Sequence, residues 1–423
     1  MNVLVALWDG GGTVPAEVGV VRRLRARGHA VTVLADPTLE RDVAATGAAF
    51  VAWREAPHRR SAGERDLIDD TECRTPPQVL HRILDRLVAG PAGAFAAEVR
   101  EQLAARPTDV VVASGVLLGA LLGAESRGVP AVALCSNIYN RPAPGLPPFG
   151  SGLPPARGPL GRVRDRALSA VAGRLWDRGL PALNAARRDL GLDPLPELWG
   201  QWDRAARVLV LTSPAFDLPA QLPGNVRYVG PVLDDPAWAE AVAPPAGPEP
   251  LVVAGLSSTY QRQGDLLRRI VAALSRLPVR AVVPTGPMVD PADLPGTDRI
   301  AVVRAASHAR LFAQADAVIT HAGHGTLMKA LAAGVPTLCL PMGRDQGDNV
   351  VRARRHGAVL SLRPSASPDR IATAVQRLLG DAALKQAAET LGARIRADAA
   401  SPALVDEIER ATGHGAAHRV APA

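Results

Sequence analysis

Residues 320–349 read THAGHGTLMKALAAGVPTLCLPMGRDQGDN. The short apolar run DAVIT at 316–320 predicts a buried strand, and residues 325–334 have helical spacing that ends at Gly334, before Pro336. The residues HAGH therefore form a glycine-rich turn between a strand and a helix. The first N–H groups of such a helix are unpaired, and the helix dipole adds partial positive charge there, so the turn predicts an anion site.

Two parts of this stretch indicate which anion would bind. The groups expected at a diphosphate are two glycines that allow close approach, a hydroxyl and an imidazole: Gly323, Gly325, Thr326 and His321. Asp345 and Gln346 begin the next helix, where a carboxylate and an amide can bind adjacent sugar hydroxyls. Asp345 alone could be a helix cap and His321 alone a loop residue, but together they occur in the order that a nucleotide sugar requires.

The rest of the chain repeats a pattern of apolar runs and helical segments. Strands are predicted at 2–8, 30–36, 48–53, 109–113, 131–135, 207–211, 251–258, 280–286, 300–305, 316–320, 337–341 and 358–362. Continuous apolar runs of this kind are typical of parallel strands buried on both faces. The sequence therefore predicts an α/β protein with parallel sheets covered by helices.

The length and the prolines divide the chain into parts. A chain of 423 residues is too long for one core. Residues 236–250 contain five prolines and no periodicity, which predicts an extended linker. We expect one domain at 1–235, a second at 251–400, and a final helix and tail at 401–423.

Composition excludes several classes of function. The net charge of +7 comes from arginines scattered among acids, without aromatic interleaving, so we do not expect nucleic-acid binding. Cys73, Cys135 and Cys339 lack the paired spacing of a metal or redox centre. The N-terminus has no basic region before its apolar run, and the longest apolar run, 111–124, is too short to span a membrane. We therefore expect a soluble, cytoplasmic protein without a metal.

A family resemblance rests on these motifs. The stretch 320–349 resembles the C-terminal signature of the UDP-glycosyltransferase superfamily, and more closely its bacterial branch that glycosylates macrolides, aromatic polyketides and other natural products. Residues 10–36, 143–155 and 251–261 resemble the N-terminal start, the acceptor-side loop and the first donor-domain strand of that family. The resemblance implies a GT-B fold, in which two Rossmann-like domains face each other across a cleft. It also implies inverting transfer of a sugar, with a deoxyhexose expected, from a dTDP- or UDP-sugar, with no cofactor and no obligatory metal.

The resemblance also assigns further positions. Ser257 and Ser258 are expected at the diphosphate, and Asp345 and Gln346 at the donor sugar. The acceptor is expected near the proline-rich loop at 141–159, with contacts from Asn137, Leu146 and Phe149. In the family the C-terminal helix returns to the N-terminal domain.

The catalytic base departs from the family pattern. Many members carry a His after the N-terminal glycines and an Asp that orients it, but this chain has Thr13 and Ser114 at those places. We name Asp9, Thr13 and His321 as catalytic candidates, with His321 acting on the leaving phosphate. Three readings stay open for the proton: Asp9 or Asp345 accepts it, the acceptor is acidic enough to need little help, or the protein binds without transferring. Asp9 could instead cap the glycine turn.

Two other functions compete with transfer. One is a catalytically degenerate nucleotide-sugar-binding or helper protein, which Thr13 and Ser114 favour. The other is a nicotinamide-dependent oxidoreductase, since DGGGTVP at 9–15 follows a strand, but this segment lacks the G-x-G-x-x-G spacing and an acid placed for a ribose. The expected partners are a nucleotide sugar and a small hydrophobic aglycone, and a homodimer is left open.

Overall fold

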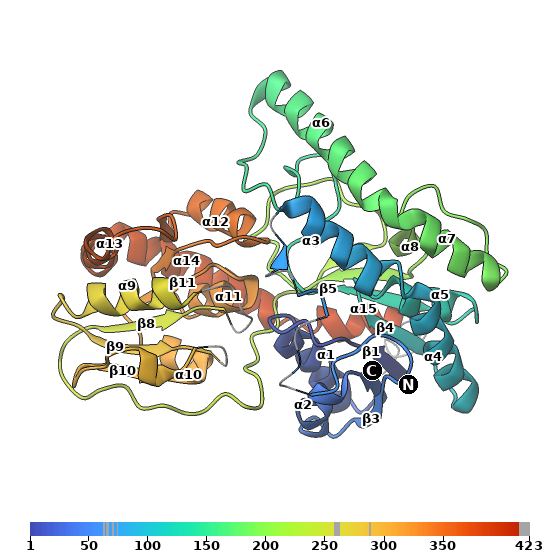
Figure 1. The fold of residues 1–423 in the computed structure, drawn as a ribbon, viewed down its shortest axis with the longest axis horizontal. Coiled ribbons are helices and arrows are strands. Elements are labelled where there is room, and N and C mark those ends of the chain that lie inside the picture. The colour runs from blue at the N-terminus through green and yellow to red at the C-terminus, as the bar shows by residue number, and fades with distance from the viewer. Residues whose placement is uncertain are drawn as a thin grey trace, which may run out of the picture.

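The computed structural model describes residues 1–61, 64, 67–69, 72–73, 75–257, 263–286 and 289–413 of the chain. These residues form two lobes, each built on a parallel sheet with helices packed around it (Figure 1). The predicted α/β fold with two Rossmann-like domains is confirmed.

The N-terminal sheet has seven strands in the order β3-β2-β1-β4-β5-β6-β7. Their bounds are β1 Asn2–Ala6, β2 Ala30–Ala35, β3 Ala49–Ala52, β4 Val110–Ser114, β5 Ala131–Cys135, β6 Arg207–Val210 and β7 Val226–Tyr228. Every pairing is parallel. The sequence patterns located six of these strands and missed β7, a three-residue edge strand with an exposed arginine in its centre.

The C-terminal sheet has six strands in the order β10-β9-β8-β11-β12-β13. Their bounds are β8 Leu251–Gly255, β9 Arg280–Pro284, β10 Ile300–Val303, β11 Ala317–Thr320, β12 Thr337–Cys339 and β13 Val359–Ser361. All six were predicted, and β11 ends where its apolar run does while the other five strands end one to three residues earlier. Their pairing is again parallel throughout.

The helices connect the strands and cover the sheets. In the N-terminal half they are α1 Val14–Ala26, α2 Glu40–Ala44, α3 Pro76–Ile83, α4 Ala92–Ala105, α5 Leu118–Glu125, α6 Gly158–Trp176, α7 Leu180–Asp189 and α8 Gly200–Asp203. In the C-terminal half they are α9 Gly264–Leu274, α10 His308–Phe312, α11 His324–Ala332, α12 Gln346–Arg355, α13 Pro368–Gly380, α14 Ala382–Ala399 and α15 Ala403–Ala411. Helix α6 extends away from both sheets, as Figure 1 shows. Helix α15 packs on the N-terminal domain, where Leu404, Val405 and Ile408 join its core.

The burial of the strands explains why the apolar runs predicted them. Every residue of β4, β5 and β8 is buried, because helices cover both faces of each sheet. Two apolar clusters fill the two faces of the N-terminal sheet and two more fill those of the C-terminal sheet. Each domain therefore has its own core.

The strand orders place a topological switch point in each sheet. In the N-terminal sheet the chain runs outward from β1 to β3 and then returns to β4 on the other side of β1. In the C-terminal sheet it runs from β8 to β10 and returns to β11 beside β8. Ligands of open α/β sheets bind at the carboxyl ends of the strands at such points. The loops after β1 and β4, and those after β8 and β11, are thus the expected places for a ligand.

The two domains are packed firmly against each other. A fifth apolar cluster joins Ile138 and Phe216 of the N-terminal domain to α11, α12 and α14 of the C-terminal domain. A buried ion pair crosses the same junction, where Arg352 Nε donates to Asp217 Oδ1 at 2.5 Å. The Ser213 hydroxyl also donates to Asp398 on α14.

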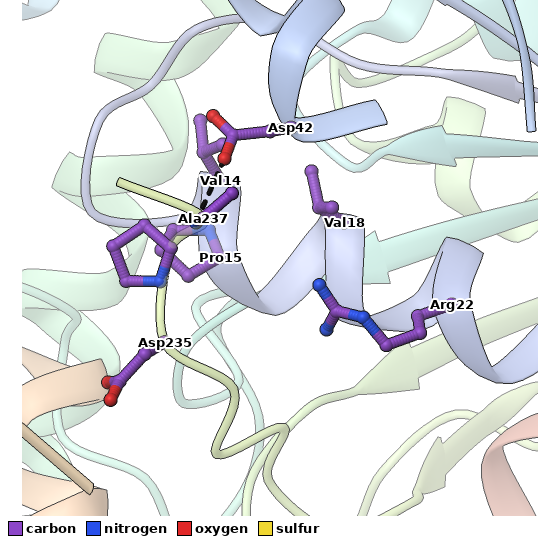
Figure 2. Close-up of a pocket in the computed structure, with 8 residues that line it drawn as sticks. Val14, Pro15, Val18, Arg22, Asp42, Asp235 and Ala237 are labelled. Atoms are coloured by element: carbon purple, nitrogen blue, oxygen red, sulfur yellow. Dashed lines mark hydrogen bonds between the residues drawn. The ribbon is translucent and has the colours of Figure 1, made fainter. Parts of the chain in front are cut away.

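The interdomain linker is fixed at its start by two adjacent acids. Asp234 pairs with Arg22 and Arg23 on α1, in the N-terminal domain. Asp235 pairs with Lys329 on α11 at 2.7 Å, in the C-terminal domain. Figure 2 shows Asp235 turned away from α1, toward the C-terminal domain. Residues 236–250, all of them described, contain no helix or strand.

Candidate active site at the domain junction

Two glycine-rich turns face each other across the domain junction. One joins β1 to α1 at 9–13, and the other joins β11 to α11 at 321–325. A Cβ placed on Gly325 would lie 3.8 Å from the Gly12 carbonyl oxygen. The carboxyl ends of β1 and β11 therefore open toward one shared space, which brings the predicted residues Thr13, Gly325 and Thr326 into one region.

The N-terminus of α11 has the geometry of an anion site. Gly323 is its N-cap, and no side chain of the described residues caps the helix. The free N–H groups and the helix dipole therefore favour negative charge here. Ala322, just before the cap, has φ of 65°, a left-handed conformation that is uncommon for a residue with a Cβ. Backbone strain of this kind is concentrated at binding sites, where the surrounding structure holds it.

His321 lies buried beside this helix end. Its Nδ1 has no hydrogen-bond partner among the described residues. Burial, with smaller contributions from His308 and Arg344 and a small opposing one from the Gly255 backbone, lowers the pKa of His321 to about 4. The ring is thus neutral near pH 7 and can donate one N–H to a phosphate oxygen. Buried polar atoms without partners are rare in folded proteins, so this nitrogen marks a ligand position.

The loop after β8 adds to the same region. Gly255 of β8 pairs in register with Thr320 of β11, so the loops that follow these strands start side by side. Ser257 is buried, and its N–H donates to Gln263 Oε1 at 3.1 Å. Gln263 Nε2 in turn donates to the Ser257 carbonyl, which fixes the loop. Ser258, the second predicted diphosphate contact, lies outside the described residues.

The sugar-binding pair predicted at the start of α12 is divided in the structure. Asp345 Oδ2 accepts from Asn349 Nδ2 at 2.9 Å, and burial raises the pKa of this carboxyl. Gln346 is only 1% exposed, and its Oε1 accepts from the N–H groups of Met342 and Gly343. The Gln346 oxygen thus holds the preceding loop, and the expected contact of Asp345 and Gln346 with a donor sugar stays a prediction.

Asn349 is a site residue that the sequence patterns did not reveal. It is fully buried, and its Nδ2 donates to the Ala322 carbonyl as well as to Asp345. One amide thus ties the turn before α11 to the start of α12. The available signal was its spacing of four residues from Asp345, which places both side chains on one face of α12.

The acceptor-side loop contacts the donor side directly. Asp348 on α12 accepts the Gly150 N–H at 2.5 Å and the Gly152 N–H at 2.7 Å. Phe149, next to this contact, is exposed, as expected for a residue that meets a ligand. Leu146 instead lies in the core of the N-terminal domain, which corrects its predicted acceptor contact, because an apolar residue in a loop can pack inward. Asn137 is half-buried after β5.

Asp9 is occupied by a structural network. Its Oδ2 accepts from Arg59 at 2.7 Å and from the Thr38 hydroxyl at 2.9 Å, and its Oδ1 accepts the Gly11 N–H. The capping role of Asp9 is confirmed by the Gly11 contact. Both oxygens of Asp9 are already held by these partners, so this network argues against Asp9 as the proton acceptor.

The oxidoreductase alternative requires an acid at the end of the second strand. The sequence analysis found none suitably placed, but Asp36 directly follows β2, the position of a ribose-binding acid in dinucleotide-binding folds. This corrects that statement. Asp36 is nevertheless fully buried, and its Oδ2 accepts the Asp9 N–H at 2.5 Å. It is therefore closed off from a ribose.

Thr13, a catalytic candidate, ends the glycine turn after β1 and immediately precedes α1. Thr13 Oγ1 is buried without a partner among the residues that the structure covers. One turn later on α1, Glu17 is buried at the carboxyl ends of β4 and β5. The sequence analysis did not single out Glu17.

The described part of the chain has no cluster of metal-ligating side chains and no helix suited to span a membrane. The described residues contain no group of three or more His, Cys, Asp or Glu side chains arranged to hold a metal ion. Within the same residues, none of the helices has the length and apolar character needed to cross a bilayer.

Comparisons with known proteins agree with this geometry. Residues 270–411 match the family described as erythromycin biosynthesis protein CIII-like, C-terminal domain. The 4'-demethylrebeccamycin synthase of Lentzea aerocolonigenes is 27% identical over 427 residues, which cover 97% of this chain and 99% of that protein. The chain is thus similar to glycosyltransferases of natural-product pathways. The resemblance read from the sequence is confirmed.

Solved structures show the same fold as this chain. The glycosyltransferase of kitacinnamycin superposes with a TM-score of 0.76 at 22% identity, over 97% of this chain and 99% of that one. The glycosyltransferase VinC, solved in complex with dTDP, superposes with a TM-score of 0.67 at 19% identity, over 98% of this chain and 100% of that one. These proteins establish the GT-B architecture.

Proposed function

We propose that the protein is an inverting, metal-independent glycosyltransferase that moves a sugar onto a small natural-product aglycone. The donor is a dTDP- or UDP-linked sugar, with a deoxyhexose as the expected class, and the location is cytoplasmic. One observation carries the proposal: the uncapped N-terminus of α11, with the unpartnered nitrogen of His321 beside it, faces the N-terminal glycine turn across the domain junction. The dTDP bound in the VinC structure supports a donor sugar that is linked to thymidine diphosphate.

In this reaction the acceptor oxygen attacks the anomeric carbon while the nucleotide diphosphate departs from the opposite face. Negative charge grows on the leaving phosphate. The α11 N–H groups and the neutral His321 ring would stabilise that charge, and donors that are fixed in advance act most strongly there. Asp345, held by Asn349, would accept hydrogen bonds from sugar hydroxyls. Phe149 and Asn137 would meet the aglycone.

The test replaces His321 with alanine. We expect kcat to fall about 10²–10³-fold, the usual cost of one lost donor to a developing oxyanion. His81→Ala, at an exposed ring on α3, is the matched control and should keep its rate. Single-turnover transfer from dTDP-glucose and UDP-glucose gives the rates, and thermal unfolding checks the fold. Equal rates for the two variants would remove His321 from the site.

A second function is favoured by Thr13 and Ser114, which stand where the related enzymes carry a His and an Asp. It is a helper protein that binds a nucleotide sugar without transferring it. Binding of dTDP or UDP by calorimetry, combined with the absence of product and of donor hydrolysis in a single turnover, would support the helper. Product formation by the wild type would exclude it.

A further inference from the structure

Asp348 on α12 is a buried carboxylate that none of the steps above uses. It is 2% exposed, and both of its oxygens accept hydrogen bonds from the acceptor-side loop of the other domain. Its Oδ2 accepts the Gly150 N–H at 2.5 Å, and its Oδ1 accepts the Gly152 N–H at 2.7 Å. Hydrogen bonds from N–H groups to a carboxylate are shorter and stronger than those between neutral groups. One side chain of the C-terminal domain therefore holds a loop of the N-terminal domain at two points.

The loop backbone is shaped to reach this carboxylate. Gly150 has φ of 79° and Gly152 has φ of 61°, a left-handed conformation that glycine adopts without steric cost. Gly152 also packs against Gly347 of α12, because a Cβ placed on Gly347 would lie 3.2 Å from the Gly152 Cα. The loop and the helix therefore meet backbone to backbone, directly beside the two hydrogen bonds of Asp348.

The earlier part of the same loop is held by its own domain. Leu146 lies in the core of the N-terminal domain, and Pro147 and Pro148 are buried after it. The proline rings fix φ at both positions, so this segment has little freedom to bend. Phe149 comes next and is 37% exposed. The Phe149 ring is therefore carried between a stretch fixed in one domain and two N–H groups fixed to the other.

The first turn of α12 also holds the residues expected at the donor. Asp345, the N-cap of this helix, comes three residues before Asp348 and accepts from Asn349 Nδ2. The same Asn349 amide donates to the Ala322 carbonyl, in the turn before α11. One helical turn thus binds the acceptor-side loop, the expected sugar contact and the turn of the expected diphosphate site. The place of the loop relative to the donor is set by this turn.

Resting on the proposed transfer reaction, we infer that Asp348 is a positioning residue for the acceptor, which holds Phe149 at a fixed place relative to Asp345. Both oxygens of Asp348 are taken by the loop, so this residue acts through the loop and not on a substrate. An aglycone bound against Phe149 is thereby kept at the donor sugar. The flat apolar face of the Phe149 ring suits an aromatic acceptor. The acceptor site is thus completed by the C-terminal domain.

The first test separates acceptor binding from donor binding. The acceptor is 4-nitrophenol, the donors are dTDP-glucose and UDP-glucose, and calorimetry measures the Kd of dTDP. For Asp348→Ala we expect kcat/KM for the acceptor to fall about 10–10²-fold, mainly through a higher KM, because a small misplacement of the acceptor is costly. The Kd of dTDP should not change, since the diphosphate turn keeps its own contacts. An unchanged acceptor KM, or an equal loss of dTDP affinity, would overturn the inference.

A second variant displaces the loop and leaves the carboxylate in place. The Cβ of Gly347→Ala would press on the Gly152 Cα, so the loop backbone must yield. Alanine favours a helix more than glycine does, so the Tm should not fall. We expect the acceptor KM to rise about 3–10-fold. Gly380→Ala, at the end of α13, is the matched control, because its Cβ would meet no atom within 4 Å. Equal acceptor KM values for the two variants would contradict the inference.

Hydrogen exchange gives a readout that does not depend on activity. In Asp348→Ala the amides of Gly150 and Gly152 lose their acceptor, so they should exchange at least about 10-fold faster than in the wild type. Asp316→Ala is the control, since Asp316 Oδ2 accepts the Leu251 N–H at 2.8 Å at the opposite edge of the C-terminal sheet. It should leave the exchange of residues 147–153 and the acceptor KM unchanged. Equal exchange of this segment in wild type and Asp348→Ala would overturn the inference.

The outcomes also distinguish the two levels of the proposal. A wild type that transfers sugar while Asp348→Ala keeps the same acceptor KM overturns the role of Asp348 alone. A wild type that neither binds dTDP or UDP nor forms product overturns the transferase, and the role of Asp348 with it. Thermal unfolding of each variant shows whether the fold is retained, and Gly347→Ala tests the inference should Asp348→Ala fail to fold.

Discussion

The two glycine turns that meet at the domain junction have the same local plan and opposite chemistry. Each follows a central strand and opens a helix, and Gly12 of one lies close to Gly325 of the other. The turn after β11 presents bare N–H groups and a neutral imidazole, so it suits an anion. The turn after β1 lies near two buried acids, Asp36 and Glu17, so it suits a group that gives up a proton. The two turns thus share one architecture, with hydrogen-bond donors at one and carboxyl groups near the other.

The difference teaches that fold and chemistry are set at separate levels. Parallel strands followed by helices produce the two turns and bring them to the same edge of their sheets. What each turn does depends on the few side chains behind it, which come from distant parts of the chain. Ser114 and Ser136 reach Glu17, and Asn349 reaches Ala322.

The largest expected effect is on the free energy of unfolding, when the buried ion pair at the domain junction is broken. Arg352→Met leaves Asp217 buried without its guanidinium, and we expect a loss of about 3–5 kcal/mol in the free energy of unfolding. Arg276→Met is the matched control, since its pair with Asp369 is exposed and should contribute less than about 1 kcal/mol. Urea unfolding at pH 7 measures both. Similar midpoints for the two variants would show that the buried pair does not hold the domains together.

The second prediction compares the effect of an added methyl group in each of the two turns. A Cβ on Gly323 would lie 2.2 Å from His321 Nε2, so Gly323→Ala must displace the imidazole. We expect kcat to fall about 10²–10³-fold, as for loss of the ring itself. A Cβ on Gly12 would meet no described atom within 4 Å, so Gly12→Ala should keep the wild-type fold and lose less than about 10-fold. Steady-state transfer rates test the pair, and a larger loss for Gly12→Ala would reverse the assigned roles.

The smallest expected effect is a change of stability with pH, which has opposite signs at the two turns. Burial lowers the pKa of His324 from 6.5 to about 4, so the unfolded chain binds its proton first. The stability contribution of this histidine is therefore present above about pH 6.5 and is lost as pH falls toward 4, opposite in sign to that of Glu17, whose pKa burial raises to about 7. Between pH 6.5 and 5 the loss is on the order of 2 kcal/mol, at about 1.4 kcal/mol per pKa unit.

The variant that tests this response is His324→Gln, which can retain a hydrogen bond to Thr212. It should reduce the fall in Tm between pH 6.5 and 5 and leave the Tm above pH 6.5 unchanged. Thermal unfolding across that range, with the exposed His81→Ala as control, measures the difference. Parallel curves for wild type and His324→Gln would contradict the assignment.

Much of this architecture was predictable from the sequence because its causes are local. Buried parallel strands read as continuous apolar runs, and the glycine turn before α11 reads directly as a helix end. The anion site followed from neighbouring residues. These features do not depend on distant contacts.

The remainder depends on tertiary packing. Glu17 and Asn349 look like ordinary polar residues of a helix, and only residues far away in the sequence make them buried and bonded. Asp345 and Gln346 were paired because they are adjacent, but consecutive residues of a helix do not face the same way. Leu146 was assigned to a ligand because it lies in a proline-rich loop, whereas the domain core takes it up.

The neighbouring acids at the start of the linker have a mechanical consequence. Asp234 is fastened to α1 and Asp235 to α11, so the peptide bond between them is one of the places where the chain passes from one lobe to the other. The chain passes back between α14 and α15, at residues 400–402. Two bodies joined at two points turn most easily about the line through those points. These crossings are thus the two places at which the covalent chain couples the lobes.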